Sequence, residues 1–288
     1  MRFSCVIPAR DKNDLKLKDL ISSIKAQDFP QDQIEIHVIT EGDSESAKAI
    51  GIKRSTGDIC VMLCADNYLT DPTLFSKVNK EIGMFSSVYE KHYFYDPCDN
   101  SLNRYFSLIG NNDPVPFYLG KCDREPWVDG LYKTTSFPSY GCNGFFVRRE
   151  AFKDTNLDDY YPMDAHLDMS KKGHDYLCLD QGTVWHRTSD SLISFLKKRY
   201  NYAKDLYCDR SNRRWRIIDT IQDKLKLLLF IFSVITIFPC IYISLKGFIK
   251  IKDLAWFYHW PVCVGFLIIY SFLVFRNLIK HKTIFQRN

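Results

Sequence analysis

The sequence contains no CxxC pair, no internal repeat and no low-complexity segment. Its 10 cysteines are scattered along the chain, and Cys60 and Cys64 fall in an apolar, strand-like run. This spacing fits neither a zinc-ribbon site nor a disulfide framework, so we expect buried free thiols in a reducing cytoplasm. We also expect no signal peptide, because the apolar run Phe3–Pro8 is short and ends in proline.

Charged residues are missing from two long apolar runs late in the chain, Leu227–Leu245 and Leu254–Phe275. A helix of about 20 apolar residues crosses the hydrocarbon core of a bilayer. Only residues 246–253 separate the two runs, which suffices for a turn between neighbouring helices. We therefore predict a transmembrane helical hairpin over residues 223–276. A buried hairpin of a soluble protein is the alternative.

Basic residues flank this predicted hairpin. Residues 197–226 hold ten Lys or Arg against four Asp, and the tail 277–288 is basic without an acid. Basic flanks stay on the cytoplasmic side, so we expect a two-helix membrane protein whose N-terminal domain is cytoplasmic. The net charge of +5 is concentrated here, which indicates contact with membrane lipids and not with nucleic acid. Nothing in the sequence indicates an oligomeric state.

The residues before the hairpin alternate between apolar strand-like runs and amphipathic helices. Strands alternating with helices of this length predict an α/β domain with a mostly parallel central sheet. Ligands of such sheets bind beyond the carboxyl ends of the strands. The expected strands are residues 3–8, 34–40 and 58–64, and the expected helices are residues 14–26 and 44–55. Three loops then meet at one edge of the sheet: residues 8–11, 41–43 and 65–67.

Four segments in this order resemble the nucleotide-sugar half of family 2 glycosyltransferases: Val6–Arg10, Ile39–Ser44, Thr56–Ile59 and Leu63–Asn67. The resemblance is close over residues 3–80 and looser to about residue 190. It implies a GT-A fold, inversion at the anomeric carbon and a divalent cation, Mg²⁺ or Mn²⁺. The implied domains are a GT-A domain (1–190), interfacial basic helices (191–222), the hairpin (223–276) and a cytoplasmic tail (277–288).

The same resemblance assigns the candidate metal ligands. Asp66 matches the metal-binding second Asp of the family's DxD motif, whereas Cys64 replaces the first. A hard cation held by carboxylate oxygen would neutralise the diphosphate leaving group. Asn67 is a candidate for a compensating oxygen, and His186 matches a histidine that touches metal or diphosphate. The alternatives are a plain turn at Asp66 and Asn67 and a packing role for His186.

Donor binding is implied for the loops that follow the first two strands. Pro8 and Ala9 resemble the segment that lies against the nucleotide, and Arg10 pairs with phosphate or is a solvated loop charge. Glu41 matches an acidic position that contacts the base or ribose, with Asp43 as a second candidate.

Residues 95–140 contain five prolines and are predicted to form a non-helical loop that covers the site or receives the acceptor. Lys121, Asp123 and Arg124 are candidates for binding phosphate or acceptor, although Asp123 and Arg124 could equally form a salt bridge within the loop. Gly141 and Asn143 lie in a glycine-containing segment that resembles the family's acceptor loop.

The family's catalytic base is an Asp at the start of a helix, where it deprotonates the acceptor hydroxyl. Asp164 is the first candidate and Asp168 the second, while a helix-capping role for Asp164 is the alternative. Further along, apolar residues from Leu192 to Tyr207 recur at helical spacing, which predicts a helix lying on the membrane. Arg199 on that helix is a candidate for binding an isoprenyl phosphate.

Together, the apolar runs and the resemblance to family 2 glycosyltransferases imply a membrane-anchored inverting glycosyltransferase. It would use a nucleotide-sugar donor and a lipid-linked or glycan acceptor, such as a polyisoprenyl phosphate or a surface-glycan precursor. One alternative is a catalytically inactive relative acting as a membrane scaffold, because Cys64 replaces an expected Asp. Another is a sugar nucleotidyltransferase, which normally has a Gly-rich, basic first loop that residues 8–11 do not show.

Overall fold

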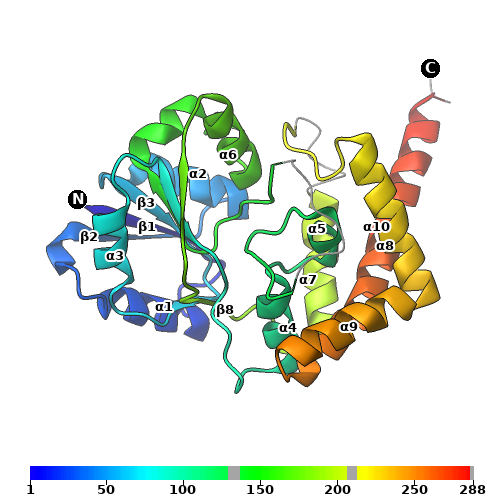
Figure 1. Cartoon of the computed structure of the whole chain (residues 1–288). Helices are drawn as coiled ribbons and strands as arrows, with labels where there is room; N and C mark the ends of the chain where they lie inside the picture. Colours follow the sequence, from blue (N-terminus) through cyan, green and yellow to red (C-terminus); the bar gives the residue numbers. More distant parts are fainter. Residues whose placement is uncertain (129–136, 206–212, 286–288) are drawn as a thin grey trace. The chain divides into compact units, whose positions relative to one another are not determined.

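The computed structural model describes residues 1–128, 137–205 and 213–285, and the chain forms two compact units (Figure 1). Unit 1 consists of Met1–Tyr95, Asp123–Glu125 and Ser139–Arg187. Unit 2 consists of Asp96–Cys122, Pro126–Pro138 and Thr188–Asn288.

Unit 1 is built on a six-stranded sheet with the order β2-β1-β3-β6-β5-β7. Strand β1 pairs in parallel with β2 and β3, and β5 pairs in parallel with β7, whereas β6 is antiparallel to both of its neighbours. The prediction of a mostly parallel α/β sheet is therefore confirmed. The strands are β1 Phe3–Pro8, β2 Ile34–Ile39, β3 Ile59–Met62, β5 Ser87–Glu90, β6 Phe145–Arg148 and β7 Tyr176–Leu179, with a separate antiparallel pair β4 Asn67–Leu69 and β8 Val184–His186.

Helices cover both faces of this sheet because successive strand residues point to opposite sides. Phe3, Cys5 and Ile7 of β1 pack with helices α1 and α3, whereas Val6 packs with α2, α6 and the 3₁₀ helix η2. Gly51 lets α2 approach β1 closely, since a Cβ there would lie 2.4 Å from a methyl carbon of Val6. The bounds are α1 Leu15–Lys25, η1 Gln31–Gln33, α2 Ser44–Arg54, α3 Leu74–Glu81, η2 Arg149–Asp154 and α6 Pro162–Lys171.

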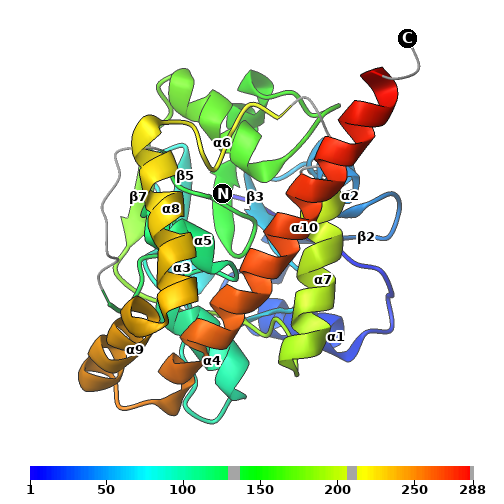
Figure 2. The ribbon, with the colours of Figure 1, turned by 90° about the vertical axis from the view of Figure 1, so that its right-hand side faces the viewer.

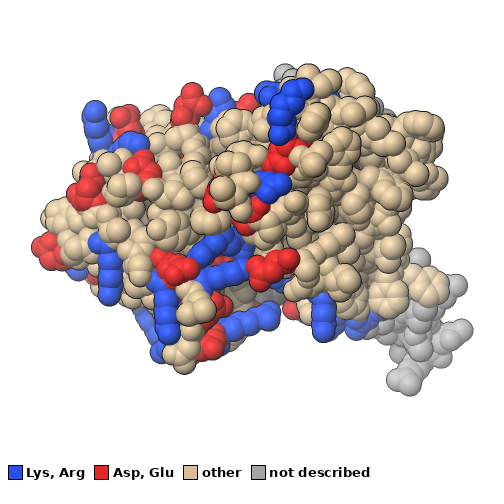
Figure 3. Space-filling view, turned by 90° about the horizontal axis from the view of Figure 1, so that it is seen from below, with Lys and Arg blue, Asp and Glu red and all other residues tan. Residues whose placement is uncertain are grey.

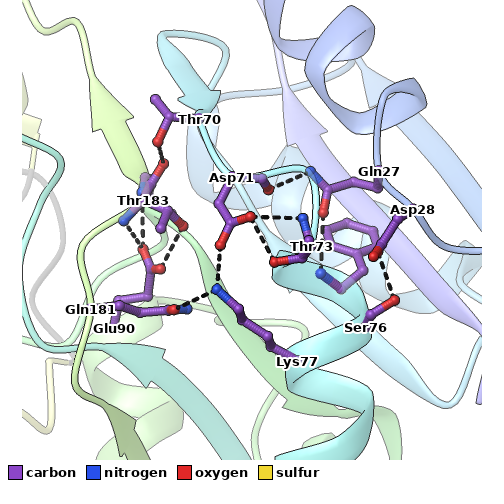
Figure 4. A network of polar contacts seen from close by, with 12 residues as sticks. Gln27, Asp28, Thr70, Asp71, Thr73, Ser76, Lys77, Glu90, Gln181 and Thr183 are labelled. Atoms are coloured by element: carbon purple, nitrogen blue, oxygen red, sulfur yellow. Dashed lines mark hydrogen bonds and ion pairs between the residues drawn. The ribbon is translucent and has the colours of Figure 1, made fainter.

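A polar network holds the small β4–β8 sheet in place within unit 1 (Figure 4). The Gln27 side chain donates to the Asp71 carbonyl at 3.0 Å and accepts from the Phe75 amide at 3.1 Å. Asp71 accepts from the Lys77 ammonium at 2.6 Å. On the other strand, the buried Glu90 carboxylate accepts from the backbone amide and the hydroxyl of Thr183. The end of β4 and the start of β8 are therefore held in place. Because the two strands are antiparallel, these contacts also position the residues at the start of β4 and the end of β8.

Unit 2 is helical, and α10 contacts α5, α7, α8 and α9 (Figure 2). The short helix η4, which precedes α10, packs against α4 and α9. The bounds are α4 Ser101–Ile109, α5 Pro114–Leu119, α7 Leu192–Lys204, α8 Ile221–Thr236, α9 Phe238–Lys250, η4 Leu254–Tyr258 and α10 His259–Phe285.

The prediction that residues 95–140 are non-helical is wrong, because they contain α4 and α5. Asn100 caps α4 by accepting from the Asn103 amide, and Gly110 ends the helix with φ 70°. Asp113 caps α5 in the same way, and Pro114 occupies its first turn. Proline at the first helical position costs no hydrogen bond and already has the required φ, so it starts this helix and does not break it.

The first apolar run does not form one straight helix. Helices α8 and α9 meet at an angle of 91° around Ile237, whose φ is 68°, and a proline occupies the first turn of α9. Their 16 and 13 residues correspond to lengths of about 24 and 20 Å, below the roughly 30 Å of a hydrocarbon core. Among the described residues, one helix, Leu254–Asn277, is long and apolar enough to cross a membrane alone. The bent pair meets the same criteria only when taken together.

Helices α8 and α9 nevertheless expose many large apolar side chains. The fraction exposed is 78% for Ile221, 57% for Phe232, 70% for Ile235, 78% for Phe238 and 71% for Ile249. In the view of Figure 3, charged side chains gather on the left, and uncharged residues cover most of the right. Exposed apolar surface of this kind marks a site of contact with another protein or with a membrane.

Helix α7 covers most of the segment that the sequence predicts to lie on the membrane as an interfacial helix. Its apolar stripe packs on α10, where Ala203 forms a buried cluster with Ile269 and Leu273, flanked by Leu196 and Tyr200. The stripe was expected to continue to Tyr207, which lies outside the described residues.

Lys121 forms a buried ion pair in unit 2, although the sequence indicated a phosphate-binding role for it. Its ammonium lies 3.0 Å from Asp223 and donates to the Ile217 carbonyl at 2.7 Å, and both charged side chains are at most 1% exposed. This pair anchors the N-terminus of α8, where Asp223 belongs to a capping box with Thr220.

We expect Lys121→Met to destabilise unit 2 by about 3 kcal/mol, because it leaves the Asp223 charge buried without its cation. Thermal unfolding of the detergent-purified chain measures the effect. Lys91→Met is the matched control, since Lys91 pairs with Asp180 on the surface and its loss should change the midpoint little. Equal midpoints for Lys121→Met and wild type would contradict a stabilising role for the buried pair.

Candidate functional site

Asp66 and His186 come together at the carboxyl end of β3. The turn after β3 is closed by two hydrogen bonds: the Asn67 amide donates to the Cys64 carbonyl at 2.9 Å, and the Cys64 amide donates to Asn67 Oδ1 at 2.8 Å. Strand β4 begins at Asn67 and pairs with β8 so that Asn67 lies opposite His186. This register places His186 Nε2 3.4 Å from Asp66 Oδ1.

The Asp66–His186 pair offers one carboxylate oxygen and one imidazole nitrogen, both common metal ligands. The Asp66 side chain is 15% exposed, so a ligand can reach it, and that of His186 is 7% exposed. A divalent cation that is bound by few protein groups completes its shell with water and substrate phosphates. Asp66 and His186 therefore fit the part that the protein would play in holding a metal–diphosphate group.

Asn67 is placed differently from these two residues. Its side chain is fully buried, its oxygen accepts from the Cys64 amide, and its nitrogen donates to Asn143 Oδ1 at 3.2 Å. The Asn67 side chain thus shapes the turn that presents Asp66.

A buried polar chain extends from Asn67 into the segment around residue 143. The side-chain nitrogen of Asn143 donates to the Tyr93 hydroxyl at 3.0 Å, and that hydroxyl donates to the Asp123 carboxylate. Asp123 also accepts from the Gly141 amide at 3.1 Å. Burial, followed by the charge of Asp123, raises the pKa of Tyr93 well above its usual value. Four residues predicted separately, Asn67, Asp123, Gly141 and Asn143, are therefore joined in one network.

Arg124 is a buried cation at the centre of this network. Its guanidinium lies 3.5 Å from Asp123, donates to the Asn143 carbonyl, and stacks over Tyr93 and Phe145 at 5.1 and 4.5 Å from their ring centres. The salt bridge between Asp123 and Arg124, left open as an alternative in the sequence analysis, is present. A buried guanidinium packed on aromatic rings gives this unit a fixed positive charge.

Cys64, which stands where the family has its first motif Asp, lies beside Cys142. Their sulfur atoms are 3.2 Å apart, and Cys142 is buried. The hydrogen bond to Cys142, together with burial, raises the pKa of the Cys64 thiol, so Cys64 is neutral at physiological pH. The carboxylate missing from this position is thus replaced by an uncharged, close-packed thiol.

The five candidate donor residues lie at the end of β1 and in the loops after β1 and β2. The Ala9 amide donates to the Ile39 carbonyl at 2.9 Å, which joins the ends of the two strands next to Pro8. Arg10 is exposed. The Glu41 carboxylate pairs with Arg54 at 2.9 Å, and Asp43 caps α2 through the amides of Glu45 and Ser46.

The two candidate bases lie in helix α6. This helix begins earlier than expected, with Tyr161 at the N-cap and Pro162 in the first turn, so Asp164 is a first-turn residue and not the cap. Asp164 is fully buried, whereas Asp168, one turn later, is partly exposed. Residues of α6 share a hydrophobic cluster with Cys142, which places this helix on the same face of the sheet as the thiol pair.

Two candidates belong to unit 2 and not to this network. Lys121 is held by Asp223, as described above. The Arg199 guanidinium stacks over Tyr202 and Phe266, at 4.7 and 5.9 Å from their ring centres.

The sequence analysis missed Tyr93, Cys142 and His166. Tyr93 follows β5, so recognition of that strand would have placed it at the same edge of the sheet as Asp66. His166 lies between the two candidate bases but belongs to an aromatic cluster with Tyr140, Phe145 and Tyr176, which no local pattern reveals.

His166 makes the stability of unit 1 depend on pH. Burial, followed by the nearby Arg124 charge, lowers its pKa to about 3. Between pH 6.5 and pH 3, the His166 imidazole is protonated in the unfolded chain but not in the folded chain. The free energy of unfolding therefore falls by about 1.4 kcal/mol per pH unit over this range.

We therefore expect wild type to lose about 2 kcal/mol more than His166→Phe between pH 7 and pH 5. Denaturant unfolding at several pH values, monitored by the fluorescence of Trp185 in unit 1, tests this difference. Parallel pH profiles of the two proteins would refute it.

No protein-family model matches this sequence, and neither does any curated protein. Solved structures do match. A mannosyltransferase from Pyrobaculum calidifontis, in complex with GDP-Man and Mn²⁺, is similar over 96% of this chain and 87% of its own, with 12% identity and a TM-score of 0.53. Staphylococcus aureus TarS in complex with UDP (residues 1–349) is 14% identical over 85% of this chain and 75% of its own, with a TM-score of 0.41. The likeness to the mannosyltransferase shows that the two chains share a fold.

Proposed function

We propose that this protein is a membrane-anchored, inverting glycosyltransferase. It would transfer a sugar from a nucleotide-sugar donor to a lipid-linked or glycan acceptor, such as a polyisoprenyl phosphate or a surface-glycan precursor. The observation that carries the proposal is the Asp66–His186 pair at the carboxyl end of β3, in a fold shared with a mannosyltransferase. Ligands of open α/β sheets bind at this edge.

On the donor side, Asp66 and His186 would hold Mg²⁺ or Mn²⁺ against the diphosphate. The cation supplies Lewis-acid stabilisation of the leaving group. Pro8 and Ala9 would lie along the nucleotide, and Arg10, the only one of the three with a charge, would pair with phosphate. Glu41 and Asp43 would accept hydrogen bonds from the base or ribose, with Arg54 holding Glu41 in place.

On the acceptor side, inversion needs one carboxylate that deprotonates the attacking hydroxyl. Asp164 is the first candidate, and because it is buried, the acceptor hydroxyl would have to reach into the fold beside α6. Asp168 is the more accessible second candidate. Asp123, Arg124, Gly141 and Asn143 would shape the acceptor side through the network that joins them to Asn67.

Membrane attachment would come from α8, α9 and α10, supported by the apolar side chains that α8 and α9 expose. The basic residues before α8 and after α10 favour the cytoplasmic face for unit 1. Arg199 would then be available to an isoprenyl phosphate from the membrane side.

We expect the full chain to stay in the membrane pellet after an alkaline carbonate wash, because α10 is long enough to span the bilayer. Immunoblotting of pellet and supernatant measures this. Quantitative release into the supernatant would show that these helices are the core of a peripheral protein.

A catalytically inactive scaffold is the second candidate function. The neutral Cys64 thiol in place of a motif carboxylate favours it. It is also favoured by the ion pairs that Glu41 and Asp123 already form within the fold. A sugar nucleotidyltransferase is the third, with no specific contact in its favour. Donor hydrolysis by the detergent-purified chain, screened with UDP-, GDP- and CMP-sugars and Mn²⁺, separates them. Release of nucleoside diphosphate from a UDP- or GDP-sugar, or of CMP from a CMP-sugar, supports the transferase. Release of pyrophosphate from a sugar phosphate and a nucleoside triphosphate supports the nucleotidyltransferase, and the absence of both reactions supports the scaffold.

A further inference from the structure

A second group of metal-ligating side chains lies inside unit 2. Cys240 of α9 and His259 and Cys263 of α10 bring two sulfur atoms and one imidazole nitrogen within 4.8 Å of one another. All three side chains are fully buried. His259 and Cys263 are four residues apart on one helix, which places them on the same face. We propose that this cluster binds a zinc ion that ties α9 to α10.

The distances fit tetrahedral zinc. Zn–S bonds of about 2.3 Å and Zn–N bonds of about 2.0 Å at tetrahedral angles separate S from N by about 3.5 Å. The Cys263 sulfur lies 3.8 Å from His259 Nε2, so a shift of a few tenths of an ångström suffices. The Tyr118 hydroxyl lies 3.4 Å from the Cys240 sulfur and 3.1 Å from His259 Nε2, at the fourth corner of the same group.

The surroundings of His259 are those of a metal ligand. Its other nitrogen, Nδ1, lies 2.8 Å from the Tyr105 hydroxyl, which is also fully buried. When Nδ1–H donates to the Tyr105 oxygen, Nε2 carries the lone pair that can bind a metal, and the Cys263 sulfur lies 3.8 Å from it. Metal-bound histidines typically donate their second nitrogen in this manner, which fixes the tautomer and the ring.

Charge balance selects the kind of metal. Binding replaces the two thiol protons: Zn²⁺ and two Cys–SH groups give a neutral Zn(S–Cys)₂ centre and two released protons, with His259 as a neutral ligand. Without metal, the Cys240 thiol donates to the Ser233 carbonyl at 3.4 Å, and this proton is one of the two. A neutral centre suits full burial, whereas a hard cation such as Mg²⁺ would require oxygen ligands.

This inference does not depend on the proposed transferase activity. The site would act as a structural cross-link between the two helices that follow the bend, with α4 and α5 contributing Tyr105 and Tyr118. Zinc bound only by the folded chain would stabilise it.

The test measures metal in the full chain, purified in detergent with reductant and without a polyhistidine tag. We expect one zinc per chain by inductively coupled plasma mass spectrometry, and a near-complete loss in Cys240→Ser and Cys263→Ser. Cys178→Ser is the matched control, because Cys178 is exposed in unit 1 and should keep the full zinc content.

Cobalt substitution keeps the test valid if a variant fails to fold. Wild type titrated with Co²⁺ should show thiolate-to-metal charge-transfer bands, and Tyr105→Phe should weaken Co²⁺ binding by about 10–100-fold by removing the partner of Nδ1. Background zinc in wild type together with a Co²⁺ spectrum lacking these bands would overturn the proposal. A Cys240–Cys263 disulfide, detected by mass after alkylation without reductant, would overturn it as well.

Discussion

Asp66→Ala is expected to abolish sugar transfer and to remove the metal dependence of nucleotide binding. Among the described residues, Asp66 is the carboxylate paired with His186, so its loss leaves the imidazole of this pair to hold the cation against the diphosphate. Metal stabilisation of a leaving group contributes several kcal/mol, and each 1.4 kcal/mol is a factor of ten in rate. We therefore expect turnover to fall by at least about 10³-fold.

Calorimetry of UDP or GDP binding, with and without Mn²⁺, separates the metal role from a loss of folding. Asp158→Ala is the matched control, because Asp158 pairs with Lys53 on the surface of the same unit and should leave binding unchanged. The metal assignment fails if Asp66→Ala binds nucleotide plus Mn²⁺ as tightly as wild type. His186→Ala should weaken the same binding to a smaller extent.

Asp164→Asn should eliminate transfer while sparing donor binding. The amide has the size of the carboxylate but cannot accept a proton at neutral pH, and a general base contributes roughly 10²–10⁴-fold to rate. We expect donor affinity within a few-fold of wild type and a small change in thermal stability, because the buried site keeps its shape.

Asp168→Asn is the paired variant, one helical turn further into α6 and partly exposed. It should lose less activity than Asp164→Asn. The reverse order would move the base to Asp168, which is the more accessible carboxylate. If both variants turn over normally, α6 has a structural role, and Asp123 becomes the next residue to test.

Much of unit 1 was predictable because its strands are continuous apolar runs and its first helices carry one apolar face. The apolar runs predicted approximately where β1, β2 and β3 end, and therefore the loops that hold Arg10, Glu41 and Asp66. The contact between Asp66 and His186 could not be derived from local pattern. It depends on the pairing of β4 with β8, two short strands far apart in the chain.

The remaining differences have identifiable physical causes. Proline at the start of α5 favours a helix, whereas the sequence analysis predicted this proline-containing segment to be non-helical. The burial of Arg124 depends on aromatic rings from β5 and β6, so its ion pair with Asp123 was only one of two alternatives. The bend at Ile237 falls in a run that is apolar on both sides, where hydropathy carries no information about direction.

In the proposed membrane-anchored protein, that bend would decide on which side of the membrane the basic tail emerges. A chain that crosses twice returns to its starting side, and a chain that crosses once does not. If α10 crosses once, the bent pair of α8 and α9 fixes the total: as a broken span the pair adds a second crossing, and as a re-entrant loop it adds none. Basic residues both before α8 and after α10 favour an even number. An epitope placed after α10 should therefore be labelled from the same side as unit 1.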